Sequence, residues 1–163
     1  MKALTLWQPW ASLVAFGEKR VETRCWTTKY RGPLLIHAAA KEPPDWLGAS
    51  RFRSEFGEAV RVISERHNWG EWYWPVHNPN GPLKNLAEAG LGSILCLATL
   101  AAVETVEVVR DDLSEQERLF GNYEDGRYAW FLENVQRLES PLPAKGNRML
   151  WNYAAEVPLP VLT

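Results

Sequence analysis

Residues Gly17 to Trp26 read "GEKRVETRCW" and place four charged side chains of both signs within six positions. The preceding stretch, "LTLWQPWASLVAF" at residues 4–16, contains no charged residue. A surface helix usually spreads its charges over one solvated face, whereas this charged cluster lies where one predicted element ends and the next begins. We interpret it as the polar floor of a pocket. The alternative is an exposed network of ion pairs, which would contribute only about 0–1 kcal/mol.

Length and composition predict one globular domain that spans residues 1–163. The chain is long enough for a hydrophobic core, and 46% hydrophobic with 23% charged residues is typical of a soluble protein. No run approaches the roughly 18 apolar residues of a membrane span, and the N-terminus lacks the apolar core of a signal peptide. Cys25 and Cys96 lie far apart in the sequence, which suits reduced thiols. We therefore expect a cytoplasmic protein with no membrane partner.

The charge is distributed unevenly along the chain. Five basic and two acidic residues lie between Gly17 and Arg31, so this window has a formal charge of +3 (five minus two). Because the whole chain has a net charge of −2, the remainder carries −5. An anionic partner would be drawn to this one edge. The five basic residues are Lys19, Arg20, Arg24, Lys29 and Arg31.

Hydrophobic patterns in the first part of the chain predict alternating strands and helices. Pro9 fits a first helical position and Gly17 fits the position just past a helix end. The expected elements are a strand at 2–6, a helix at 8–17, strands at 19–24 and 32–40, and a helix in at least the second half of 46–67.

The rest of the chain adds more strands and one short helix. Ser114 and Glu117 form a capping-box pattern at the start of that helix. Five or more strands with a few short helices in one domain predict an α+β fold, built on a small barrel or a strongly curved sheet. The expected elements are a loop at 68–82, one long or two joined strands at 92–109, a helix at 114–120, and strands at 127–138 and 149–159.

Several chemical signatures are missing from the sequence. It contains no G-x-S-x-G motif, no Walker loop and no G-x-G-x-x-G motif. The three histidines and two cysteines show no spacing typical of metal ligands. We therefore expect neither a metal site nor a cofactor.

The charged cluster contains the pattern G-x-K-x-x-E-x-R, formed by Gly17, Lys19, Glu22 and Arg24. Together with "LTLWQPWASLV" before it and "YRGPLLIHAA" after it, this pattern resembles the ASCH domain, a relative of the PUA and YTH-type RNA-binding barrels. The segment "GRYAWFLENVQRLESPLPAKGNRMLWNY" is similar to the closing part of that family. The resemblance covers about 3–40 closely and about 90–155 more loosely. It implies a single PUA-like small barrel decorated by short helices, with an unmatched insertion at about 42–86.

The resemblance implies a cleft around this motif, and elementary chemistry suggests how the residues would act there. Glu22 would supply the counter-charge for a shielded Lys19, and the two should lie within about 4 Å of each other. Arg24 would offer a planar donor fork to a base edge or phosphate. The other candidate binding residues are Trp10, Trp26 and Tyr128 as stacking surfaces, Lys29 and Arg31 as a phosphate-holding rim, and Gln8 and His37. For His37, a core histidine bonded to a carbonyl is an equally weighted alternative.

Three kinds of function follow from the resemblance. The first is binding of a nucleoside, modified or not, or of single-stranded RNA or DNA, with RNA preferred. The second is an enzyme that uses Lys19 and Glu22, either an amidohydrolase acting on N-acylated cytidine or a ribonuclease. Family members of the amidohydrolase type use a threonine nucleophile where this chain has Glu22. The neighbouring Thr23 should point to the opposite face of a strand, so Glu22 would be the general base. The third is a regulatory domain with a protein partner.

Overall fold

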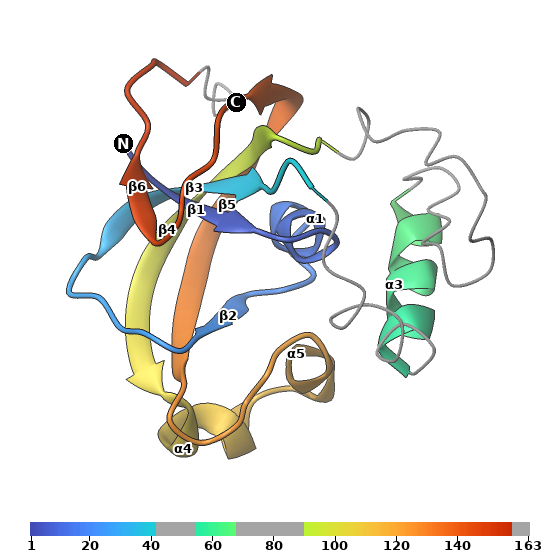
Figure 1. Cartoon of the computed structure of the whole chain (residues 1–163). Helices are drawn as coiled ribbons and strands as arrows, with labels where there is room; N and C mark the ends of the chain where they lie inside the picture. Colours follow the sequence, from blue (N-terminus) through green and yellow to red (C-terminus); the bar gives the residue numbers. More distant parts are fainter. Residues whose placement is uncertain (42–54, 68–89, 158–163) are drawn as a thin grey trace.

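The computed structural model describes residues 1–41, 55–67 and 90–157, and Figure 1 shows how their elements are arranged. Most of the insertion expected at about 42–86, including the loop expected at 68–82, lies outside these residues. Within the described ranges, no helix is both long and apolar enough to cross a membrane.

Six strands form one mixed, curved sheet (Figure 1). The order across it is β2-β5-β4-β3-β1-β6, so β2 and β6 form its two edges in the described part of the chain. β1 and β3 run parallel, and every other neighbouring pair is antiparallel. The expected α+β class is confirmed, with an open half-barrel as the sheet. The strands are β1 (Lys2–Leu6), β2 (Val21–Arg24), β3 (Gly32–Ala38), β4 (Ser93–Thr105), β5 (Tyr128–Pro143) and β6 (Leu150–Asn152).

Local sequence signals mark the end of the first helix and the start of the last one. Gly17 follows the first helix with φ 77°, a left-handed conformation that glycine adopts without a Cβ clash. Ser114 caps the last helix, because its hydroxyl oxygen accepts the backbone N–H of Glu117 at 3.2 Å, as the capping pattern predicts. The helical elements are α1 (Trp10–Ala15), α3 (Glu55–Arg66), α4 (Val106–Val109), a 3₁₀ turn (Arg110–Asp112) and α5 (Glu115–Leu119).

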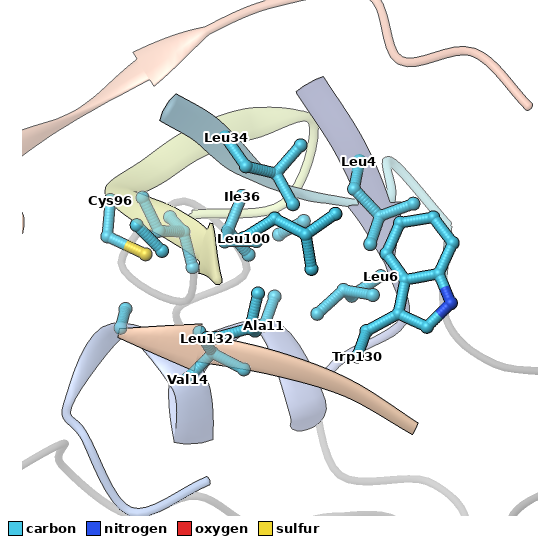
Figure 2. Close-up of a cluster of buried hydrophobic side chains, with 14 residues drawn as sticks. Leu4, Leu6, Ala11, Val14, Leu34, Ile36, Cys96, Leu100, Trp130 and Leu132 are labelled. Atoms are coloured by element: carbon cyan, nitrogen blue, oxygen red, sulfur yellow. The ribbon is translucent and has the colours of Figure 1, made fainter. Parts of the chain in front are cut away.

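The main hydrophobic core lies between one face of the sheet and α1. Figure 2 shows apolar side chains from the strands facing Ala11 and Val14 of α1. A second apolar cluster joins α1, α3 and α5. Along β3 the side chains alternate: Leu34 and Ile36 face α1, whereas Leu35 lies in a separate cluster with Trp151 on the opposite face. These two faces matter for the positions of the candidate site residues.

Several expected boundaries were wrong; among them, β2 begins at Val21 and not at 19, and β3 ends at Ala38 and not at 40. The strand expected to continue to residue 109 ends at Thr105, because Val106 is buried against Val21 and Ala129 at the start of α4. Tertiary packing therefore outweighs the β-branched composition of this stretch. β5 extends past 138 to Pro143, which pairs with Ser93 of β4. Of the expected strand at 149–159, residues 158–159 lie outside the described part of the chain, and within that part the strand covers only 150–152, where it pairs with three residues of β1. In addition, α1 begins one residue after Pro9.

Candidate functional site

Lys19 lies between the end of α1 and the start of β2, and its side chain is completely buried. Its Nζ donates to the backbone carbonyl of Val21 and lies 3.6 Å from Oε2 of Glu22. The expected contact between Lys19 and Glu22 is therefore confirmed. Burial lowers the pKa of the Lys19 ammonium from its ordinary value, and the carboxylates of Glu22 and Glu117 only partly oppose this shift.

Glu117 of α5 is the second buried carboxylate near Lys19. Its oxygens accept the backbone N–H groups of Arg20 and Val21, the latter at 3.2 Å. A residue almost a hundred positions later in the sequence therefore holds the start of β2. Burial raises the pKa of Glu117, and the charge of Lys19 opposes the rise. From the sequence, only a capping role was expected for Glu117. Its helical spacing from Leu113 and Phe120 was the available signal that it faces the interior.

Glu22 and Arg24 form the part of this cluster that reaches solvent. Nε of Arg24 lies 3.3 Å from Oε1 of Glu22, and the two side chains are 24% and 12% exposed. Nη2 of Arg24 also donates to the backbone carbonyl of Thr5 in β1 at 3.0 Å. Lys19 therefore lies behind Glu22, and Arg24 connects the edge strand β2 to β1.

The register between β2 and β5 determines which face each side chain occupies. Glu22 pairs with Trp130 and Thr23 pairs with Ala129. Directly opposed residues share a face, so Glu22 lies on the face of Trp130 in the main core, and Thr23 lies on the other face. The hydroxyl oxygen of Thr23 accepts the backbone N–H of Asn122 at 3.2 Å. The expected opposite orientation of these two neighbours is confirmed.

Two of the three predicted stacking residues lie beside Glu22 and Arg24. Tyr128 pairs with Arg24 across β2 and β5 and is half-buried. Trp26 follows β2 by two residues and packs edge-on against Trp130, with ring centroids 4.6 Å apart. Both rings therefore border the part of the cluster that reaches solvent.

Trp10, the third predicted stacking residue, lies in the cluster between α1, α3 and α5. Its ring stacks on Phe56 at 5.5 Å, and its indole N–H donates to the carbonyl of Phe120 at 3.0 Å. Gln8 is also buried and exchanges two hydrogen bonds with Ser12, which fixes the start of α1. Both residues therefore support α1 from within the fold.

His37 lies apart from the Lys19 cluster. It is fully buried on the face of β3 opposite the main core, edge-on to Trp151 with ring centroids 5.6 Å apart. Its Nε2 is 3.0 Å from the carbonyl of Ala144, so this nitrogen is the donor. Burial lowers the pKa of His37, although the hydrogen bond to Ala144 opposes the shift. This geometry corresponds to the core-histidine alternative.

The predicted basic rim is exposed on the loop between β2 and β3. Lys29 and Arg31 are both exposed. One guanidinium nitrogen of Arg31, Nη1, donates to the backbone carbonyls of Thr28 and Tyr30 at 2.9 and 2.8 Å. These bonds hold the loop.

Glu18, the residue before Lys19, joins the motif to two helices. Its carboxylate lies 2.7 Å from Nε2 of His67 and 3.1 Å from Nη1 of Arg66, both at the end of α3. Gln116 of α5 donates to the backbone carbonyl of Glu18 at 2.7 Å. Although burial opposes the shift, these hydrogen bonds and the charge of Arg66 lower the pKa of Glu18. The sequence alone indicated no partner for this residue.

Among the described residues, no group of three or more His, Cys, Asp or Glu side chains could hold a metal ion.

A family model for the ASCH domain matches residues 4–142. The chain belongs to the ASCH domain family.

Relatives of this ASCH domain occur within larger proteins. It is similar to activating signal cointegrator 1 of Homo sapiens, with 29% identity over 154 residues, and to the Mus musculus protein, with 28%. Each match covers 94% of this chain and 22% of the relative, so the chain spans about a fifth of the length of these curated relatives. The crystal structure of ASCH from Zymomonas mobilis is 16% identical, with a TM-score of 0.44, over 87% of this chain and 72% of that one.

Proposed function

We propose that this ASCH domain binds a nucleoside or a single strand of nucleic acid, preferably RNA, at the surface formed by Glu22, Arg24, Trp26 and Tyr128. We call this surface the seam site, because it lies where β2 faces β1. The observation that supports the proposal is the partly exposed Glu22–Arg24 pair on the strand face that it shares with Tyr128, with the half-buried Trp26 two residues further along the chain. Membership of the ASCH family is consistent with it.

The chemistry of the seam site suits an unstacked base. The carboxylate of Glu22 can accept amino or imino N–H groups, and the guanidinium of Arg24 can donate to a base edge or phosphate. Trp26 and Tyr128 offer flat faces, and base stacking on such rings is worth about 1–3 kcal/mol per base. Lys29 and Arg31 would hold phosphates without regard to sequence. The bonds to Lys19 and Thr5 fix the two charged groups before a ligand arrives.

Fluorescence anisotropy with short labelled RNA strands tests the proposal. Glu22→Gln and Arg24→Met should each lower affinity about tenfold or more, since a good base contact contributes about 1–3 kcal/mol. Arg148→Met is the matched control, because Arg148 is an exposed arginine that precedes β6. The proposal fails if the wild-type protein binds no single strand at low salt, or if Arg24→Met behaves like the Arg148 control.

Amide hydrolysis is the second candidate, and it is favoured by the buried Lys19 beside Glu22. Glu22 would take a proton from a water molecule while the oxygen of that water adds to the carbonyl carbon of an N-acylated base. The Lys19 ammonium would stabilise the developing oxyanion. The C–N bond then breaks, and the amine leaves with the proton returned by Glu22. Incubation with N-acylated cytidine measures this directly. Glu22→Gln should lower turnover about a hundredfold, whereas Thr23→Val should have little effect.

Two other functions remain as weaker candidates. A ribonuclease would use the same Lys19 and Glu22, and the labelled RNA used for anisotropy would then be cleaved. A regulatory role with a protein partner is supported by the name of the relatives, activating signal cointegrator 1. That name describes proteins of which this chain matches only 22%.

A further inference from the structure

Trp7 is an exposed tryptophan at the end of β1, and the proposed function gives it no role. Its exposed fraction is 37%, whereas Trp10, Trp130 and Trp151 are buried. Trp26 is half-buried against Trp130. A single exposed aromatic residue needs no explanation in itself. A role for Trp7 therefore depends also on its position relative to the seam site.

The seam has a defined geometry at this point. β6 pairs with β1 only at Lys2–Leu4, so the last two residues of β1 run past the end of β6. The carbonyl of Leu6 accepts from Ala39 on the β3 side. Since carbonyls alternate along a strand, the carbonyl of Thr5 faces the opposite side, where it accepts from Arg24.

Trp7 and Trp26 follow the two strands that this bridge joins. The pairings make β2 antiparallel to β5, β5 to β4 and β4 to β3, while β3 is parallel to β1. In the order of the sheet, β2 therefore runs opposite to β1. Trp26 comes two residues after Arg24, and Trp7 two residues after Thr5. Each tryptophan lies just past the end of its strand, two residues from one end of the bridge.

We propose that Trp7 is a second stacking surface of the seam site, and that the ligand is a single strand of at least two nucleotides. One base stacks beside Trp26 and Tyr128, and a neighbouring base stacks on Trp7. Arg24, whose side chain is 24% exposed and whose guanidinium forms the bridge to Thr5, faces the connecting phosphate. This inference rests on the proposed function and specifies its ligand, because an isolated nucleoside would reach only one of the two tryptophans.

The experiment compares two ligands that share one base. Affinities for adenosine monophosphate and for an adenosine octamer are measured with the wild type, Trp7→Ala, Trp7→Phe and Val108→Ala. Val108 is the control, because it is an exposed apolar residue on α4. Trp7→Ala should weaken octamer binding at least about fivefold, the lower limit for one stacked base, and change mononucleotide binding less than twofold. Trp7→Phe should retain most of the octamer affinity, and Val108→Ala should alter neither.

The outcomes separate this inference from the function on which it rests. If the wild type binds neither ligand, the proposed function fails and this inference fails with it. If the wild type binds the octamer and Trp7→Ala binds it equally well, only the role of Trp7 is overturned. An equal loss for both ligands places Trp7 at the first base and overturns the two-nucleotide ligand. Thermal unfolding of Trp7→Ala checks that the variant is folded at the assay temperature, because only 37% of this residue is exposed.

Discussion

Lys19 and His37 are both basic and completely buried, yet their surroundings differ. His37 has a neutral backbone carbonyl and the edge of an aromatic ring beside it. Lys19 has a carbonyl and two carboxylates, and one of these belongs to a pair that reaches solvent. Burial lowers the pKa of both side chains, but only Lys19 has opposite charges around it.

This difference indicates what each buried base does. A neutral histidine with a hydrogen bond is an ordinary core residue. A buried group of charges gains little stability over an apolar core, because desolvation offsets the attraction. Burial of Lys19, Glu22 and Glu117 together therefore costs desolvation free energy. This cost is consistent with a functional site at Glu22 and Arg24.

Replacement of Lys19 should have the largest effect on stability. Lys19→Met leaves the buried Glu117 without the charge of Lys19 and leaves Glu22 with Arg24 as its ion-pair partner, which should lower the unfolding free energy by about 3–5 kcal/mol. Urea denaturation measures this difference. Lys29→Met, at an exposed lysine, should stay within about 0.5 kcal/mol of the wild type. A loss below about 1 kcal/mol for Lys19→Met would mean that the cluster does not depend on its charge.

Replacement of His37 should have a smaller effect that depends on pH. His37→Phe leaves the carbonyl of Ala144 without its donor and should cost about 1–3 kcal/mol at neutral pH. The pKa of His37 is lowered from 6.5, so below that pH the folded state binds fewer protons than the unfolded state. The unfolding free energy of the wild type should therefore fall as the pH drops below 6.5. The difference between the unfolding free energies of the wild type and His37→Phe should become smaller over the same range. RNA affinity should change less than twofold; a tenfold loss in a folded variant would assign His37 to the binding site.

The smallest effects are expected at the exposed rim formed by Lys29 and Arg31. Lys29→Ala and Arg31→Ala should each weaken RNA binding a few-fold, to a similar extent for every sequence. If each residue holds one phosphate, the slope of log affinity against log salt should become shallower by about 0.7 per residue. Affinity measured over a series of salt concentrations gives this slope. An unchanged slope in both variants would remove the rim from the binding surface.

The sequence predicted the parts of the fold that depend on local patterns. The apolar spacing of α1, the stop at Gly17 and the cap at Ser114 are encoded within a few residues of where they act. The ion pair between Lys19 and Glu22 is also local, because the two residues are three positions apart. The opposite orientations of Glu22 and Thr23 follow from strand geometry alone.

Features that depend on distant contacts were not predictable in this way. Glu117 meets Arg20 and Val21 across almost a hundred positions, and nothing near it in the sequence identifies those partners. The difference between Trp7 and Trp10 is similar, since both flank the same Gln-Pro step. Only the packing of Phe56 and Phe120 around Trp10 shows that this ring is buried while Trp7 stays exposed.

The bridge from Arg24 to Thr5 also affects how the half-barrel can open. One hydrogen bond from a charged donor contributes about 1.5–3 kcal/mol, far less than the long ladder between β4 and β5. Breaking this one bond would leave every ladder of the described sheet intact. If nucleic acid is the ligand, a strand can approach the partly exposed Arg24 from the side. The middle of a long polymer is then as accessible as its ends, and no threading is required.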